Sequence, residues 1–154
     1  MGRRRKAREL AVQVLFNLEF SSDSPADVFD LICEMFHSGK SIRSFSKELV
    51  LGVCEKRDDL DELIAQASRN WRLERMSRLD KCILRLAAFE ILFMDDIPPK
   101  VSIDEAVEIG KRFGSDGSGG FINGVLDNIY NKLVEQGRLE NREAGLDPDA
   151  SDEC

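Results

Sequence analysis

The 154 residues suit one globular domain, and 42% of them are hydrophobic, which is enough for a sizeable core. No apolar run is long enough to span a bilayer and no secretory pattern occurs, so we expect a cytoplasmic protein. The net charge of −7 argues against nonspecific nucleic-acid binding, although a local basic patch can still act. The four cysteines lack a C-x-x-C pair and there is one histidine, so we expect neither disulfides nor a metal site.

The first predicted helix begins within residues 3–8, where five residues are basic and none is acidic. Its apolar residues recur every three or four positions, which is typical of a helix with one buried face. They are Ala7, Leu10, Ala11, Val14, Leu15 and Leu18. The helix macrodipole opposes each exposed N-terminal cation by about 0.3–1 kcal/mol, so we do not expect the cluster to stabilise the fold. Two interpretations stay open from these residues: a phosphate-binding patch, or a solvated end that aids solubility.

Three more amphipathic helices are predicted before residue 70. The second helix begins at Ser24-Pro25, an N-cap followed by proline at the first helical position, and ends near Gly39. Its predicted buried face consists of Val28, Leu31, Ile32, Met35 and Phe36. The third helix has apolar positions at Ile42, Phe45, Leu49, Gly52 and Val53. The fourth, which Asp58 or Asp59 would cap, has Leu60, Leu63, Ile64 and Ala67 inside.

The segment 79–94 is apolar on almost every side of a helical wheel, which predicts a central helix enclosed by others. Ser77 can cap it, with Asp80 at the third helical position, and Arg85 belongs to its main polar edge. Glu90 lies on an apolar face, and a buried carboxylate needs a hydrogen-bonding or cationic partner. Since no second catalytic group is recognisable, we expect Glu90 to contact a neighbouring helix rather than to act in catalysis.

Two further helices follow. Pro98-Pro99 is expected to end the central helix, and residues 102–105 (Ser-Ile-Asp-Glu) have the pattern of a capping box for the next one, which ends at Gly114. The glycine-rich segment 114–120 lacks the ending of a P-loop and is interpreted as a turn between helices. The last helix begins near Phe121, and Gly124 predicts a close packing contact within it. Asn123 can be a buried hydrogen-bonding residue or an RNA contact.

The chain is therefore predicted to be all-α, a single domain of about seven helices over residues 1–134. Residues 135–154 carry seven acidic and two basic residues and few apolar ones. Such a composition cannot bury enough surface to order itself, so we expect an acidic, disordered tail.

Six short segments resemble, in order, those of the NusB family of bacterial transcription antitermination factors. They are residues 4–9, 11–16, 84–90, 96–98, 103–106 and 121–127. The resemblance implies two packed helical subdomains, joined near residues 70–78, with no enzymatic activity and no cofactor. It also implies binding of boxA-type single-stranded RNA of nascent ribosomal transcripts, together with the ribosomal protein NusE and the antitermination complex.

The resemblance implies an RNA site in two places. The basic segment contributes Arg3, Arg4, Arg5, Lys6 and Arg8. The start of the last helix contributes Phe121 and Asn123. The family commonly has lysine where this chain has Gly120, so one phosphate contact differs. It commonly has tyrosine where this chain has Phe16, so one hydroxyl contact differs. For NusE, which is basic, we expect an acidic docking face that includes Glu74 and Asp80.

Two alternatives stay beside this interpretation. The chain can be a protein-interaction module without direct RNA contact, in which the basic segment is incidental. A related helical domain also begins some ribosomal-RNA cytosine methyltransferases, but this chain has no strand–glycine loop for S-adenosylmethionine. Monomer and homodimer both stay open, since the family includes homodimers.

Overall fold

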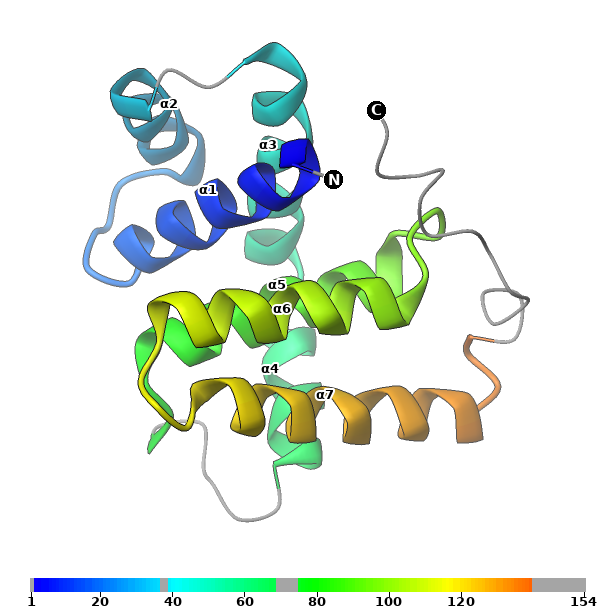
Figure 1. Ribbon diagram of the computed structural model, residues 1–154. Coiled ribbons are helices and arrows are strands. Elements are labelled where there is room, and N and C mark those ends of the chain that lie inside the picture. Colours follow the sequence, from blue (N-terminus) through cyan, green and yellow to red (C-terminus); the bar gives the residue numbers. More distant parts are fainter. Residues whose placement is uncertain (1, 37–38, 69–74, 140–154) are drawn as a thin grey trace.

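The computed structural model describes residues 2–36, 39–68 and 75–139, and within these ranges it contains helices and no strand. The all-α prediction is confirmed (Figure 1). The seven helices of the described ranges are α1 (Gly2–Leu18), α2 (Pro25–Phe36), α3 (Lys40–Glu55), α4 (Arg57–Ala67), α5 (Arg78–Phe93), α6 (Pro99–Phe113) and α7 (Ser118–Glu135). None of these helices is long and apolar enough to cross a membrane.

The helices form two packed groups, as predicted. α1, α2 and α3 contact one another, whereas α4, α6 and α7 gather around α5 (Figure 1). The groups meet where α5 packs against α1 and α3. The expected junction near residues 70–78 is wrong, because α4 already packs against α5 and α7. The chain instead passes between the groups at Lys56, which ends α3 and precedes α4.

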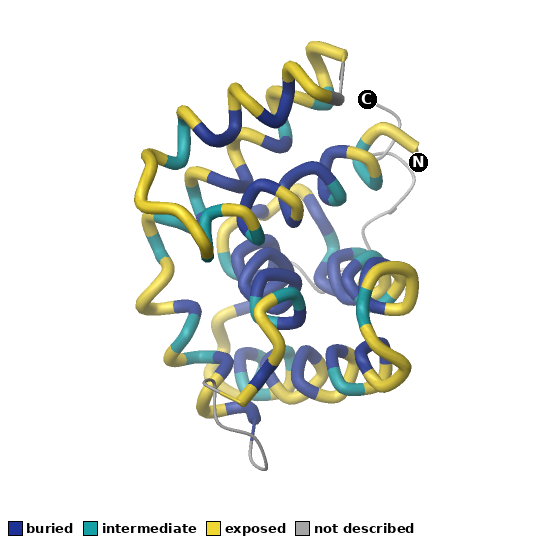
Figure 2. The backbone as a smooth tube through the Cα atoms, turned by 90° about the vertical axis from the view of Figure 1, so that its left-hand side faces the viewer, coloured by how far each residue is buried: buried dark blue, intermediate teal, exposed yellow. Residues whose placement is uncertain are grey.

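The apolar pattern of residues 79–94 correctly predicted the central helix. All residues from 82 to 91 in α5 are buried, and Figure 2 shows the buried residues concentrated in the middle of the molecule. Ser77 caps the helix as expected, with its Oγ accepting a hydrogen bond from the Asp80 N–H at 3.0 Å. Arg85, expected at a polar edge, is itself buried. Its Nε donates to Asp61 at 2.6 Å and its Nη1 to Glu19 at 3.2 Å, so the charge is paired.

The predicted boundary between α5 and α6 is wrong. α5 ends at Phe93, and Pro99 is the first residue of α6, with Pro98 as its N-cap. Proline fits the first helical position because the N–H that it lacks would have no intrahelical partner there. Ser102 and Glu105 therefore lie inside α6 and form no capping box. Their side chains contact other helices instead.

The predicted buried face of α2 is also partly wrong. Leu31 and Met35 are exposed, while Phe29 and Cys33 are buried beside Ile32. Both sets have three/four spacing, so the periodicity alone could not decide which one faces α1 and α3. The side chain of Phe36 lies outside the described part. In α4, which begins at Arg57, the expected capping aspartates occupy the first turn instead; they are Asp58 and Asp59.

α7 begins at Ser118, three residues before the predicted start at Phe121. Gly124 was expected to make a close packing contact, but it is exposed, and a Cβ atom there would meet nothing within 4 Å. The packed part of the chain reaches Leu139, which is 2% exposed, so it extends beyond the expected boundary at residue 134. The rest of the predicted tail, residues 140–154, lies outside the described residues.

Candidate nucleic-acid interface

Arg8 is the most deeply buried of the basic residues that begin α1. Its side chain is 2% exposed, and its Nε and Nη2 both donate to the carboxylate of Glu90 in α5, at 2.9–3.1 Å. Ser102 Oγ of α6 donates to the same carboxylate at 2.8 Å. The expected contact of Glu90 with a neighbouring helix is confirmed. Arg8 was also predicted to contact RNA, and its guanidinium is instead buried in this ion pair.

Arg5 joins α1 to α6. Its Nε and Nη2 donate to the two carboxylate oxygens of Glu105, each at 2.9 Å. These hydrogen bonds lower the pKa of Glu105, and the pKa of Arg5 is raised for the same reason. The Arg5 side chain is 39% exposed, so part of its surface still faces solvent.

Arg4 lies against α3. Its guanidinium stacks on the ring of Phe45, 4.5 Å from the centroid, and its Nη2 lies 3.4 Å from Asp96. Three of the five basic residues therefore hold α1 against α3, α5 and α6. We did not expect this cluster to stabilise the fold, but three of its members make tertiary contacts that oppose the small macrodipole term.

The other two basic residues differ from these three. Arg3 and Lys6 are exposed, and neither has an ion pair with any described residue. At the start of α7, Asn123 is exposed and Phe121 is half-buried against the core. The candidates with a free polar group at the surface are thus Arg3, Lys6 and Asn123.

The last turn of α6 connects the two predicted RNA-binding regions. Arg112 Nη1 donates to Glu9 of α1 at 2.9 Å. The aliphatic part of Lys111 lies across the first turn of α7, so that its Cγ would be 2.7 Å from a Cβ placed at Gly119. Two cations that sequence reasoning overlooked therefore lie between the start of α1 and the start of α7.

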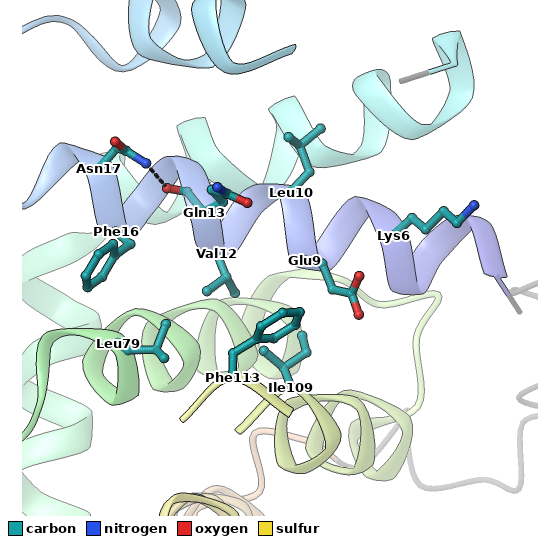
Figure 3. Close-up of a pocket in the computed structure, with 10 residues that line it drawn as sticks. All are labelled: Lys6, Glu9, Leu10, Val12, Gln13, Phe16, Asn17, Leu79, Ile109 and Phe113. Carbon is teal, nitrogen blue, oxygen red and sulfur yellow. Dashed lines mark hydrogen bonds between the residues drawn. The ribbon is translucent and has the colours of Figure 1, made fainter. Parts of the chain in front are cut away.

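A surface groove of about 760 Å³ runs along α1 between α5 and α6 (Figure 3). Its lining residues are Lys6, Glu9, Leu10, Val12, Gln13, Phe16, Asn17, Leu79, Ile109 and Phe113. Figure 3 shows the rings of Phe16 and Phe113 and the side chain of Leu79 between the three helices. Phe113, the last residue of α6, is 51% exposed. No sequence signal distinguished Phe113 from a core residue.

Of the two acidic residues that were expected to dock NusE, the structure describes only one. Glu74 lies outside the described residues. Asp80 is 8% exposed, beside the groove-lining Leu79, and its Oδ1 has no hydrogen-bond partner among the described residues. Asp80 therefore presents little surface by itself.

The described residues contain no group of three or more His, Cys, Asp or Glu side chains that could hold a metal ion. The three cysteines in this part of the chain are free. Burial raises the pKa of Cys82 to about 12 and also raises that of Cys54, so both thiols stay protonated near neutral pH.

Comparisons with known proteins agree on one family. The NusB family model matches residues 5–131. The transcription antitermination protein NusB of Desulfatibacillum aliphaticivorans is 47% identical over 142 residues, which is 92% of this chain and 99% of that protein. The NusB of Desulforapulum autotrophicum is 49% identical over 143 residues, 91% of this chain and 100% of that protein.

Solved structures give the same result. T. maritima NusB has a TM-score of 0.80 and 35% identity, covering 89% of this chain and 96% of that one. A chain in a crystal structure of the antitermination factors NusB and NusE with double-stranded RNA has a TM-score of 0.79 and 25% identity, covering 86% of this chain and 98% of that one. The family model spans most of the sequence and relatives at 47–49% identity cover nearly all of it, so this chain belongs to the NusB family.

Proposed function

We propose that this chain is a transcription antitermination factor that acts in the cytoplasm on nascent ribosomal transcripts, binding boxA-type RNA together with NusE. The observation that carries the proposal is the high identity over nearly the full length to proteins named for this function. The solved NusB–NusE–RNA complex, to which this fold is similar, supports both partners. No catalytic step is proposed, since the buried carboxylate of Glu90 is taken up by Arg8 and Ser102.

We place the RNA contacts on a surface that we call the cationic rim. It consists of the exposed residues Arg3 and Lys6, the exposed parts of Arg4 and Arg5, and Phe121 and Asn123 at the start of α7. An unpaired cation can bind phosphate without first breaking an internal ion pair, so Arg3 and Lys6 should contribute most. Half-buried Phe121 and exposed Asn123 suit contacts with unstacked bases. Arg8 acts on this surface only by holding α1 in place.

We place NusE on the apolar groove beside α1. Interface cores favour aromatic anchors in pockets, and Phe16 and Phe113 provide two such rings between α1 and α6. Phe16 lines this groove rather than the cationic rim, so the hydroxyl that the family commonly has at this position would serve the protein partner. Asp80 lies next to the groove, but its unpartnered Oδ1 is buried, so we do not place a NusE contact on that atom.

The test is a titration of labelled boxA-type RNA, and of a scrambled RNA of equal length, with this protein in the presence and absence of the cognate NusE. We expect a preference for boxA that increases when NusE is present. The rival interpretation, a protein-interaction module without RNA contact, predicts that NusE alone accounts for all RNA binding. Substitution of Arg3 and Lys6 would then leave the affinity of the pair unchanged.

A further inference from the structure

An exposed cation–π pair lies at the end of the groove opposite the cationic rim. The guanidinium of Arg78, the first residue of α5, stacks over the ring of Phe20, 4.6 Å from its centroid. Phe20 is 62% exposed and packs against Phe16, with ring centroids 5.1 Å apart at an interplanar angle of 70°. Both Phe16 and Leu79, the residue after Arg78, line the groove. The pair therefore continues the groove surface.

Arg78 differs from the other stacked cations in the described part of the chain. Each of the others also contacts a carboxylate; the pairs are Arg4 with Asp96, Arg8 with Glu90, Lys56 with Glu55 and Arg112 with Glu9. Stacking on Phe20 fixes the plane of the Arg78 guanidinium, but Arg78 has no acidic partner among the described residues. Arg78 is an exposed residue.

Helix stability does not explain Arg78. As the first residue of α5 it lies where the macrodipole disfavours a cation. The helix is already capped by Ser77, whose side chain accepts from the Asp80 N–H. A cation that opposes the dipole, lacks an acidic partner among the described residues and is stacked on an exposed ring is better explained by a contact outside the chain.

We propose that Arg78, held against Phe20, binds a carboxylate of the protein partner that occupies the groove. This inference rests on the proposed docking of NusE in the groove, and it adds Arg78 as a residue that selects the partner. A guanidinium binds a carboxylate through two parallel hydrogen bonds, and stacking on Phe20 reduces the side-chain freedom lost when they form. For a partner that is basic overall, one acidic group opposite Arg78 would fix how it is oriented in the groove.

Position favours a partner carboxylate over an RNA phosphate. Within α1, Lys6 and Leu18 are 12 positions apart, which corresponds to roughly 18 Å at about 1.5 Å per residue, and Phe20 follows two residues after the helix ends. The exposed cations without an acidic partner at the start of α1, Arg3 and Lys6, thus lie at the other end of the groove. Between the two ends the groove surface is largely apolar and aromatic, which suits a protein rather than a phosphate backbone.

The test compares Arg78→Ala, Arg78→Lys and Arg78→Glu in calorimetric titrations with the cognate NusE, and separately with boxA-type RNA. We expect the dissociation constant for NusE to rise about tenfold for Arg78→Ala, and further for Arg78→Glu. Arg78→Lys should recover little, because an ammonium keeps the charge but not the planar, bidentate contact. Arg43→Glu is the matched control, since Arg43 is an exposed α3 arginine without an ion pair to a described residue. RNA affinity should change no more for Arg78→Glu than for this control.

A second variant tests the role of the ring. Phe20→Leu should weaken NusE binding a few-fold in the wild-type background and much less when combined with Arg78→Ala, because it acts by orienting Arg78. Folding should survive Arg78→Glu, since an anion suits the first turn of a helix, and a thermal melt checks this.

Three outcomes overturn the inference. One is equal NusE affinity for wild type and Arg78→Glu, another is full recovery by Arg78→Lys, and the third is a loss of RNA affinity with NusE affinity unchanged, which would assign Arg78 to phosphate. Failure of the wild-type protein to bind NusE at all would instead overturn the proposed function. The two failures are therefore distinguishable.

Discussion

Arg8 and Glu90 form a bidentate ion pair at the centre of the molecule, joining α1 to α5 with side chains that are 2% and 1% exposed. Removal of one partner leaves the other charge buried and unpaired, which costs about 3–5 kcal/mol. Arg8→Ala should therefore lower the free energy of unfolding by about this amount, as measured in urea titrations. The double variant Arg8→Met, Glu90→Leu is the control and should lose less, because it leaves no unpaired charge. Equal losses would show that packing volume, rather than charge pairing, determines the effect.

A pH prediction follows from the pair of Arg5 and Glu105. Hydrogen bonds from Arg5 lower the folded-state pKa of Glu105 from its ordinary value of 4.5. The stabilisation from this carboxylate is thus complete above about pH 4.5 and is lost as the pH falls through the lowered value. The raised pKa of Arg5 lies far above neutral pH, so this pair adds no pH dependence to the stability near neutrality.

Glu105→Gln tests that prediction. The variant should be less stable than wild type at pH 7 by about 1 kcal/mol or less, since Arg5 is partly exposed, and the difference should shrink as the pH falls below 4.5. Glu108→Gln is the control, because Glu108 pairs with Lys111 at 3.6 Å, both side chains are largely exposed, and Glu108 forms no hydrogen bond with Arg5 among the described contacts. A difference that does not depend on pH would contradict the assignment.

The structure explains which parts of the fold could be predicted from the sequence. A helix that is apolar on nearly all sides must be enclosed, so α5 was predictable, and so was the need of Glu90 for a partner. The partner itself was not, because Arg8 lies 82 positions away and belongs to a cluster that resembles a phosphate-binding patch. The structural arginines pair with carboxylates that are distant in the sequence, whereas Arg3 and Lys6 have no such partner among the described residues. Local sequence patterns do not encode this long-range pairing.

The errors at element ends and surfaces have similar causes. Ser102 and Glu105 fit a capping box locally, but tertiary contacts with Glu90 and Arg5 use both side chains. The groove was not predictable either, since Phe16 belongs to α1 and Phe113 to α6, 97 positions later in the chain. Only the tertiary arrangement, in which both helices line one groove, shows that the two rings lie at the same surface.

Substitution of Arg3 and Lys6 by glutamine should reduce RNA binding without loss of stability. Binding to a single strand weakens with salt at a log–log slope of about −0.7 per phosphate contact, so loss of two contacts should flatten the slope by about 1.4. The thermal midpoint should stay unchanged, since neither residue pairs with a described acid. The measurement is a salt titration of boxA-type RNA binding, with a melt alongside. The charge-matched control is Arg43→Gln with Lys47→Gln, two exposed α3 residues, which should leave the slope as in wild type.

Neutralising Arg4, Arg5 and Arg8 together should give a different result. Loss of their contacts with Asp96, Glu105 and Glu90 should lower stability as well as RNA binding. An unchanged melting temperature in this triple variant would show that the α1 ion pairs contribute nothing to the fold. The contrast between the two sets of variants separates a binding role from a structural one.

Gly120→Lys should strengthen RNA binding. Gly120 lies in the first turn of α7, and a Cβ atom there would meet nothing within 4 Å, so a side chain fits without displacing a neighbour. Replacing glycine inside a helix gains up to about 1 kcal/mol of propensity, which offsets the smaller dipole penalty for a cation. One added phosphate contact should make the salt slope steeper by about 0.7 and raise affinity at low salt. Gly120→Gln, which has similar propensity and no charge, should increase stability without changing the slope. An equal gain in RNA affinity from both variants would show that helix order rather than a new contact is responsible. No gain from lysine would show that the start of α7 is not part of the RNA site.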